Sequence, residues 1–526
     1  MKDSMSHPAS DTVDAPVPAA RLGHSQPTSH LHFDTLVIGA GLSGIGTACH
    51  LTEAFPHRSL AILERRERIG GTWDLFRYPG IRSDSDMLSY GYQFRLWDSP
   101  KVLADGASIR RYIQDTAKQY GIADKVQYGL KVSSANWNSQ QRLWHLTAVH
   151  EASGGVRHFS CKFLLCCTGF FNHDEGFLPS FPGEEDFQGV RVHPQHWPED
   201  LDYKGKRVVV IGSGATAATL IPAMADDTRH ITMLQRSPSY IYSIPSADKI
   251  TQVLSHLMPR RWANQLARKR NIVLYRAVYL ACRRWPKLMR RVILGHVRRQ
   301  IGPQADMRHF TPSYMPWDER LCAVPDGDLF KAIRSGKASV ETGHIERFIH
   351  NGILLKSGQV LSADIIVTAT GLRLQTLGGM SLSVDGVPYQ LGEHLTYKGV
   401  LLENLPNLGW IFGYTNISWT LKLHLTGQYL CRLFRHMEQH GFDVVTPSDS
   451  DGNALDASIM NTLKSGYLTR DQHFLPRQGK AYPWHVPMHY GRDRKMLLED
   501  AVEDGRLEFL RARQGGAEAQ VSRAAG

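Results

Sequence analysis

One structural unit occurs twice in this chain: an apolar strand, a glycine-rich turn, a helical stretch and a second apolar strand. The first copy runs from Thr35 to Glu64 and contains GAGLSG; the second runs from Arg207 to Gln235 and contains GSGATA. Strands and helices that alternate at this spacing favour parallel sheets with helices on both faces. The repeat therefore predicts an α/β protein with two Rossmann-like dinucleotide-binding domains.

The first turn, Gly39-x-Gly41-x-x-Gly44, fits the dinucleotide-binding pattern. Its glycines permit a tight turn, a close approach of pyrophosphate to the backbone, and close packing of helix on strand. Glu64 ends the following strand, where a carboxylate accepts hydrogen bonds from a ribose diol. A chance glycine turn is the alternative, but the strand before it, the helix after it and the acid at this distance favour a dinucleotide site.

The second turn has alanine in the third position, a known variant of the pattern. The matching residues are Gly212, Ser213, Gly214 and Ala217. The following strand ends in Gln235-Arg236-Ser237, without an acid. An acid would repel the 2′-phosphate of NADP, whereas an arginine beside a hydroxyl would bind it. This site is therefore predicted to take NADP(H), with a solvated surface charge as the alternative role of Arg236. Two sites in one chain indicate one bound flavin and one exchanging nicotinamide.

Two later strands end alike in Thr-Gly, at residues 163–169 and 364–371. We infer that the first domain is split. The predicted division is an FAD-binding domain from residues 33–175 and 363–510, and an NADP-binding domain from 176–362 with a helical insertion at about 245–310. Residues 1–32 and 511–526 are expected to be disordered extensions.

Positive charge is concentrated in residues 251–300, which contain 13 Lys and Arg and no Asp or Glu. Because the whole chain carries only +11, the rest is nearly neutral, and a nucleic-acid partner is not expected. The segment interleaves arginines with apolar residues. We favour a helical insertion with solvated arginines over the alternative, a surface that makes peripheral contact with anionic lipid.

The seven cysteines are scattered and form no C-x-x-C pair, so neither a disulfide framework nor a zinc site is expected. Buried packing is the predicted role of Cys166 and Cys167. No run of 18 apolar residues occurs, which argues against a membrane-spanning helix. These features favour a reducing, cytoplasmic location.

Two longer motifs resemble one enzyme family. Residues 70–94 read GGTWDLFRYPGIRSDSDMLSYGYQF, and Phe187-x-Gly189-x-x-x-His193-x-x-x-Trp197-Pro198 matches a fingerprint of Baeyer–Villiger monooxygenases. The final fingerprint position usually holds Asp or Lys, and here it is Glu199. The chain thus resembles class B flavoprotein monooxygenases of the Baeyer–Villiger type, and most of all the subgroup with the mycobacterial ethionamide-activating enzyme. Related N- and S-oxygenating enzymes usually carry Tyr or Phe in place of Trp197.

The resemblance implies roles for individual residues. It implies FAD contacts for Ser43, Glu64, Thr72, Trp73, Asp74 and Val132, with Arg82, Ser83 and Asp84 between flavin and nicotinamide. It implies NADP contacts for Thr216, Arg236 and Ser237, and places His193 and Trp197 in the link between the domains.

The resemblance also implies a catalytic pair. Arg320, in the sequence PWDERLC, would stabilise negative charge on activated oxygen, and Asp84 would hold it in place. Family members often have a lysine before this arginine that helps to bind the 2′-phosphate; here it is Glu319. The alternative role of Arg320 is a structural ion pair.

The expected activity is FAD- and NADPH-dependent oxygenation of a small lipophilic ketone by O2 to an ester or lactone, with sulfoxidation of sulfides or thioamides as a second activity. An N- or S-oxygenating flavin monooxygenase without ketone activity is the alternative enzyme. A non-catalytic nucleotide-binding sensor is the alternative from another class, and the intact turns and Arg320 argue against it.

Overall fold

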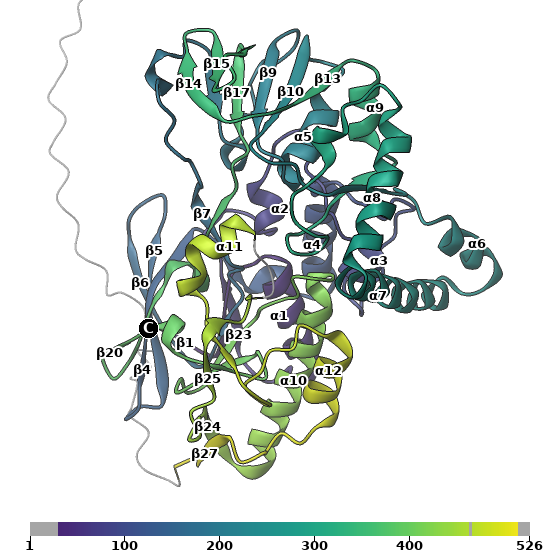
Figure 1. Cartoon of the computed structure of the whole chain (residues 1–526). Coiled ribbons are helices and arrows are strands. Elements are labelled where there is room, and N and C mark those ends of the chain that lie inside the picture. Colours follow the sequence, from purple (N-terminus) through teal and green to yellow (C-terminus); the bar gives the residue numbers. More distant parts are fainter. Residues whose placement is uncertain (1–29, 462–464, 514–526) are drawn as a thin grey trace, which may run out of the picture.

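Two sheets, one for each glycine-rich unit, organise the fold (Figure 1). The computed structural model describes residues 30–461 and 465–513. Each unit supplies a parallel strand pair to its sheet, β1 with β2 and β9 with β10. The predicted α/β architecture with two Rossmann-like domains is confirmed.

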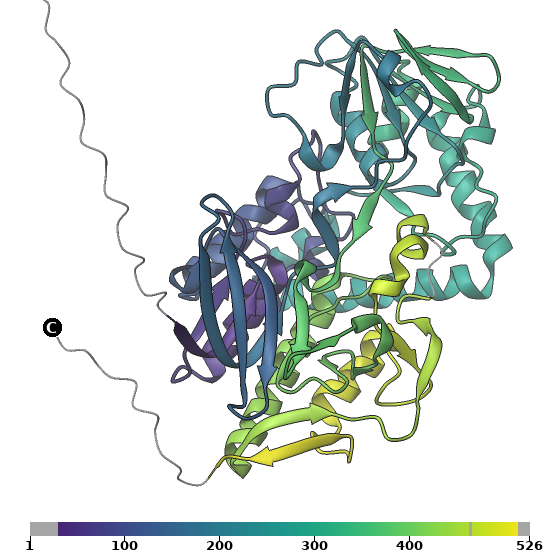
Figure 2. The ribbon, with the colours of Figure 1, turned by 90° about the vertical axis from the view of Figure 1, so that its left-hand side faces the viewer.

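The first sheet has the strand order β20-β19-β4-β5-β6-β1-β2-β3, and β23, β22 and β21 continue from β6. Its core strand β1 pairs in parallel with β2 and β6, whereas β4, β5 and β6 form an antiparallel meander (Figure 2). The strands are β1 (Leu31–Ile38), β2 (Leu60–Leu63), β3 (Val126–Gln127), β4 (Leu130–Asn138), β5 (Leu143–His150), β6 (Val156–Cys166), β19 (Ser381–Val384), β20 (Val387–Tyr389), β21 (Thr396–Tyr397), β22 (Leu401–Leu402) and β23 (Leu408–Trp410).

The second sheet has the order β13-β10-β9-β17-β8, and each of these pairings is parallel. Its strands are β8 (Val190–Val192), β9 (Arg207–Ile211), β10 (His230–Gln235), β13 (Ala338–Thr342) and β17 (Ile365–Thr368). Helices α5 (Ala215–Met224) and α9 (Asp328–Arg334) pack on each other beside it. A small antiparallel sheet follows, made of β14 (Ile345–Ile349), β15 (Gly352–Leu355) and β16 (Val360–Ser362).

The strand β17 corrects the predicted domain boundary at residue 363. β17 pairs with β9 and β8 and therefore completes the second sheet. The chain returns to the first sheet only after the crossover strand β18 (Leu372–Leu374), which pairs antiparallel with the outgoing strand β7 (Phe171–Gly176). The error has a physical reason: a buried apolar strand carries no local signal for which of two sheets it joins.

The two predicted disordered extensions are also too long. Leu31 and His32 belong to β1, and Arg511 ends strand β27 (Leu507–Arg511), which pairs with β24 (Phe442–Pro447). Residues 1–29 and 514–526 of the two predicted extensions lie outside the described part of the chain. The C-terminal region further contains β25 (Ala454–Ser458), β26 (Arg477–Gly479), α11 (Gly466–Asp471) and α12 (Tyr490–Arg494).

The basic segment forms three consecutive helices, α6 (Lys249–Leu257), α7 (Arg260–Arg284) and α8 (Pro286–Ile301). They lie between β11 (Ile241–Ile244) and β12 (Cys322–Pro325), two strands that pair in parallel. None of the helices in the described ranges has the length and apolar character needed to cross a membrane.

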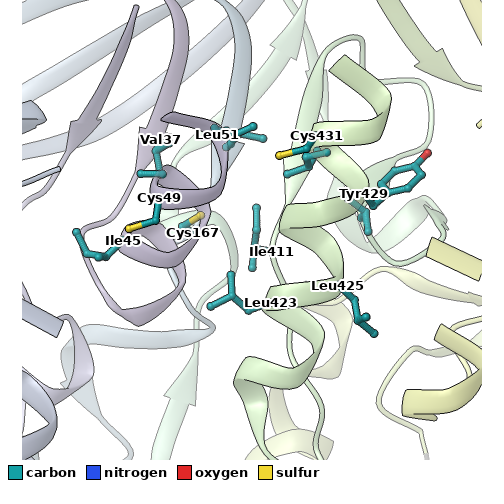
Figure 3. Close-up of a cluster of buried hydrophobic side chains, with 14 of the residues drawn as sticks. Val37, Ile45, Cys49, Leu51, Cys167, Ile411, Leu423, Leu425, Tyr429 and Cys431 are labelled. Atoms are coloured by element: carbon teal, nitrogen blue, oxygen red, sulfur yellow. The ribbon is translucent and has the colours of Figure 1, made fainter. Parts of the chain in front are cut away.

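Helix α1 (Leu42–Ala54), which follows the first turn, packs against α10 (Trp419–His440) over a shared apolar cluster (Figure 3). Leu51 of α1 faces α10, which contributes Leu423 and Cys431 to this cluster. All seven cysteines are buried and free, as predicted for Cys166 and Cys167. The packing anchors the helix whose N-terminus forms the first candidate site.

Candidate functional site

A pocket extends from the first glycine-rich turn to Arg320 and is lined by residues of both domains. One end contains Gly39, Gly41 and Glu64 of the first domain. The other end contains Asp84 and Arg320, with Ala215 of the second domain beside them. The pocket thus joins the two predicted nucleotide sites to the predicted catalytic pair.

The first turn has the geometry that a pyrophosphate requires. Gly41 caps α1 without any side-chain hydrogen bond, so the first N–H groups of the helix remain available. A methyl group on Gly41 would come no closer than 3.5 Å to the protein, at the Cα of Gly71. The protein therefore leaves the space above Gly41 open, and a ligand that approaches this backbone explains why glycine stands there. The turn fits a dinucleotide.

Glu64 lies at the carboxyl end of β2, is 4% exposed, and lines the pocket. Its Oε2 accepts a hydrogen bond of 2.6 Å from the Ala40 amide, and its Oε1 accepts one of 2.9 Å from the Arg66 amide. Burial raises the pKa of this carboxyl group, and the two amides act in the opposite direction. Glu64 therefore fixes the glycine turn from behind as well as facing the pocket, where a ribose could donate to it.

Four further residues predicted to contact FAD line the same pocket: Ser43, Thr72, Trp73 and Val132. Thr72 and Trp73 begin the short helix α2 (Thr72–Leu75), and Trp73 Nε1 donates a 3.0 Å hydrogen bond to Tyr90 Oη on α3 (Met87–Tyr90). Val132 lies where the register between β4 and β5 shifts. Such a bulge interrupts the ladder and frees backbone groups for a ligand.

Asp74, which is also predicted to contact FAD, is held in a cluster of ion pairs. Asp74 is 1% exposed, is not part of the pocket lining, and lies among four arginines. They are Arg66 at 2.8 Å, Arg77 at 3.0 Å, Arg68 at 3.1 Å and Arg110, on α4 (Gly106–Gln119), at 3.3 Å. These four cations compensate the burial of the carboxylate. Asp74 anchors the helix that carries Thr72 and Trp73.

Arg320 and Asp84 meet although 236 positions separate them in the sequence. Arg320 Nη2 lies 3.2 Å from Oδ1 and 3.1 Å from Oδ2 of Asp84, and both side chains line the pocket. The neighbouring Ser83 is buried and donates a 2.8 Å hydrogen bond to the carbonyl of Ser85, which fixes the loop that carries Asp84. Arg82 Nη1 donates to Asp328 Oδ2 at 2.7 Å and ties this loop to the second domain.

The loop before Arg320 is held by the long helix α7. Trp317 has a left-handed backbone, with φ of 69°, and its ring lies edge-to-face on Tyr279 at 5.3 Å. Arg283 Nη1 donates to Asp318 Oδ1 at 2.9 Å. A non-glycine residue keeps this backbone conformation only where its surroundings impose it. The position of Arg320 therefore depends on its packing against α7.

The second turn is open to solvent. Gly212 has φ of 144°, and a methyl group there would lie 2.3 Å from the Ala369 carbonyl oxygen, so the fold itself requires this glycine. At Gly214, in contrast, a methyl group would meet no described protein atom within 4 Å. Gly214 caps α5 without a side-chain hydrogen bond. As at Gly41, the space that the protein leaves open fits a phosphate group.

The residues around the second turn lie as a nucleotide site requires. Arg236 and Ser237 are exposed after β10, and the Ser237 carbonyl accepts a 3.1 Å hydrogen bond from Ser213 Oγ. Ala217 is buried within α5, while Thr216 hydrogen-bonds to Tyr78, a residue of the shared pocket. Burial raises the pKa of Tyr78 to about 12, and the hydrogen bond with Thr216 acts in the opposite direction.

The fingerprint residue His193 lies at the link between the sheets. Its Nε2 is 3.3 Å from the Gly371 carbonyl oxygen, and its Nδ1 accepts a 3.2 Å hydrogen bond from the Gln195 amide. A methyl group on Gly176 would overlap the imidazole ring at 2.0 Å. His193 thus packs on the end of β7 beside the returning chain. Trp197 packs against the apolar cluster of the second domain.

Sequence reasoning missed an aromatic wall of the pocket. Trp419 and Phe170 stack with ring centroids 5.1 Å apart, and Tyr414 lines the pocket nearby. Trp419 Nε1 donates a 3.1 Å hydrogen bond to Ser43 Oγ at the start of α1. Residues 413–421, with the sequence GYTNISWTL, contain two of these residues, but only the fold brings this segment to the first turn. The wall supplies an apolar surface to the pocket that Arg320 also lines.

The chain is similar to known flavin-binding monooxygenases. The family model described as Flavin-binding monooxygenase-like matches residues 34–375. The FAD-containing monooxygenase MymA of Mycobacterium tuberculosis is 61% identical over 492 residues, which is 93% of this chain and 99% of the relative. The FAD-containing monooxygenase EthA of the same organism is 46% identical over 483 residues, 91% of this chain and 98% of the relative.

Among solved structures, the fold is similar to a steroid monooxygenase bound to NADP, with a TM-score of 0.75 and 20% identity over 91% of this chain and all (100%) of that one. It is also similar to cyclohexanone monooxygenase with bound ε-caprolactone, with a TM-score of 0.67 and 19% identity over 80% of this chain and 90% of that one.

Proposed function

The chain belongs to the flavin-binding monooxygenase-like family, and we propose that it uses FAD, NADPH and O2 to convert a lipophilic ketone into an ester or lactone. The reaction consumes one ketone, one O2, one NADPH and one proton, and yields one ester, NADP⁺ and water. FAD would lie along the first turn, and NADPH along the second. Both relatives described above are named as FAD-containing monooxygenases.

The observation that carries the proposal is the Arg320–Asp84 pair in the same pocket as the first glycine turn. When bound, FAD supplies the redox chemistry between NADPH and O2. Attack on a ketone carbonyl needs an oxygen nucleophile that carries negative charge. Arginine remains protonated at every physiological pH and presents a fixed positive charge to that oxygen. Asp84 orients the guanidinium, because its carboxylate lies within 3.2 Å of Nη2.

The aromatic wall serves the same chemistry by excluding water. Trp419, Phe170 and Tyr414 cover one side of the pocket with large side chains. Removing water from the site strengthens the interaction of Arg320 with a developing negative charge. It also gives a lipophilic ketone an apolar surface on which to bind. A small apolar ketone, rather than a sugar or a nucleotide, is therefore the proposed substrate class.

The decisive experiment supplies the FAD-loaded protein with NADPH, ¹⁸O2 and a panel of linear, cyclic and aryl ketones together with sulfides. We expect esters or lactones that each contain one ¹⁸O atom. Sulfoxides without any ester would instead support an N- or S-oxygenating enzyme. NADPH oxidation that yields only hydrogen peroxide with every compound would contradict both activities.

The choice between NADPH and NADH gives a separate prediction at Glu319. Burial raises the pKa of Glu319, and the positive charge of Arg236 acts in the opposite direction. A carboxylate beside Arg236 would weaken binding of a 2′-phosphate. Replacement by lysine adds a charge-assisted contact, so Glu319→Lys should lower the KM for NADPH on the order of tenfold.

The measurement is steady-state NADPH oxidation, with NADH as the internal control because it lacks the 2′-phosphate. Glu319→Lys should leave the KM for NADH unchanged, and Arg236→Gln should raise only the KM for NADPH. An equal change with both coenzymes would place Glu319 and Arg236 away from the 2′-phosphate.

A further inference from the structure

Helix α7 exposes its large apolar residues and buries its small ones. Trp262, Leu266, Val273 and Leu280 are 65%, 49%, 67% and 49% exposed. At 3.6 residues per turn they lie within about 40° of one another around the helix axis. The residues that α7 buries are Ala263, Asn264, Ala267, Asn271 and Cys282. A surface helix of a soluble protein has the opposite arrangement, with its large apolar residues facing the core.

The neighbouring helices extend this apolar surface. Ile250, Val253 and Leu257, at spacings of three and four, follow one face of α6 and are 62%, 59% and 76% exposed. Of the 22 large hydrophobic residues exposed in the described ranges, 12 lie within residues 250–292. Helix α6 packs on α7 and projects from the body of the protein (Figure 1). An apolar concentration of this kind marks a contact surface.

The same surface is strongly positive. Residues 251–300 contain 13 Lys and Arg and no acid. Three of these cations, Arg260, Arg270 and Arg283, form ion pairs with carboxylates. The other ten have no carboxylate within ion-pair distance among the described residues. One of them, Arg268, faces the body of the protein and donates to backbone carbonyls, which leaves nine for this surface. The partner of this surface must therefore supply both apolar area and negative charge.

We propose that helices α6, α7 and α8 dock the protein on the surface of an anionic lipid bilayer. The large apolar side chains would enter the boundary between headgroups and acyl chains, and the arginines would reach the headgroup phosphates. Trp262 and Trp285, 65% and 57% exposed, have the amphipathic rings that settle at this depth. A nucleic acid would satisfy the charge and leave the apolar surface in water. A second copy would bring two positive surfaces together.

The docking surface is connected to the pocket through α7. Arg283 and Tyr279 of this helix hold the loop that carries Arg320. Arg268 Nη1 donates hydrogen bonds of 3.1 Å and 2.9 Å to the carbonyls of Leu88 and Gly91, beside the pocket residue Tyr90. A bilayer under the outer face of α7 would thus lie next to the elements that form the pocket. Binding to lipid does not depend on the reaction proposed above.

The test is vesicle flotation of the full-length, FAD-loaded protein. We expect it to float with vesicles of phosphatidylcholine and phosphatidylglycerol at low salt, and not with phosphatidylcholine alone. Because the charge contribution is screened, about 0.5 M salt should reduce flotation. The variant Trp262→Gln, Leu266→Gln, Val273→Gln, Leu280→Gln should lower the floated fraction at least about tenfold, since it removes the inserted apolar groups and retains every arginine.

The matched control replaces four exposed apolar residues elsewhere, Val156→Thr, Leu178→Gln, Val360→Thr and Val387→Thr, and should float like the wild type. FAD absorbance and thermal stability of both variants establish that they are folded. Absence of the wild type from the anionic vesicle fraction would overturn the proposal. So would a wild-type dimer in solution that the α7 variant converts to a monomer, because a second copy would then cover this surface.

Discussion

Replacing Arg320 with alanine is expected to stop ester formation while NADPH oxidation continues. The side chain lies in the pocket beside Asp84 and outside the second glycine turn, so its loss leaves both predicted nucleotide sites intact. Removing one preorganised charge from an oxyanion site typically costs ~10²–10³ in rate. We therefore expect ester yield per NADPH to fall at least about 100-fold, with hydrogen peroxide accounting for the electrons.

The measurement compares three quantities in one reaction: NADPH consumed, ester formed and hydrogen peroxide released. Arg320→Lys keeps the positive charge but loses the planar fork, so partial ester yield is expected. Asp84→Asn keeps the Arg320 guanidinium but holds it less firmly. Part of the NADPH consumed should therefore yield hydrogen peroxide instead of ester. Arg494→Ala is the matched control, because Arg494 pairs with Glu499 at comparable exposure on α12 and does not line the pocket. If Arg320→Ala gave the wild-type ester yield, the role of Arg320 would be only that of a structural ion pair.

The two turns were predictable because their requirements are local. Gly39 and Gly44 are dictated by the turn itself, and Gly41 by the open space above it. Glu64 followed from its position at the end of the next strand. In each case the residue type and its spacing in the sequence are sufficient to predict the local geometry.

Other features depend on partners that are distant in the sequence. The strand β17 resembles β6, since both are buried and run into Thr-Gly, and only pairing with β9 assigns it to the second sheet. The ion-pair cluster of Asp74 depends in part on the fold, because three of its arginines stand within eight residues and the fourth, Arg110, comes from α4. The amphipathic pattern of α7 was visible, but whether its apolar side faces the core depends on what the helix packs against.

Replacing Gly44 with alanine is expected to give a protein without FAD. A methyl group on Gly44 would lie 1.8 Å from the Gly39 carbonyl oxygen and 3.0 Å from its carbon. The obstacle is backbone, so no side chain can rotate away, and the turn must open at a cost on the order of 3 kcal/mol or more. Opening it displaces Gly39 and Gly41 together, which removes the phosphate site. Flavin absorbance relative to protein absorbance after purification measures the loss.

Two other glycines separate this effect from the mere addition of a methyl group. Gly295 lies in α8, where an added methyl group would meet no described atom within 4 Å, so Gly295→Ala should retain full FAD and gain about 0.5–1 kcal/mol of stability. Gly214→Ala, in the open second turn, should also retain FAD but raise the KM for NADPH, since its methyl group would occupy the phosphate space.

If Gly44→Ala bound a full complement of FAD, the first turn could not be the flavin site. If Gly214→Ala left the KM unchanged, the second turn could not be the NADPH site. The three substitutions add the same methyl group, so any difference among them must come from what surrounds each Cα.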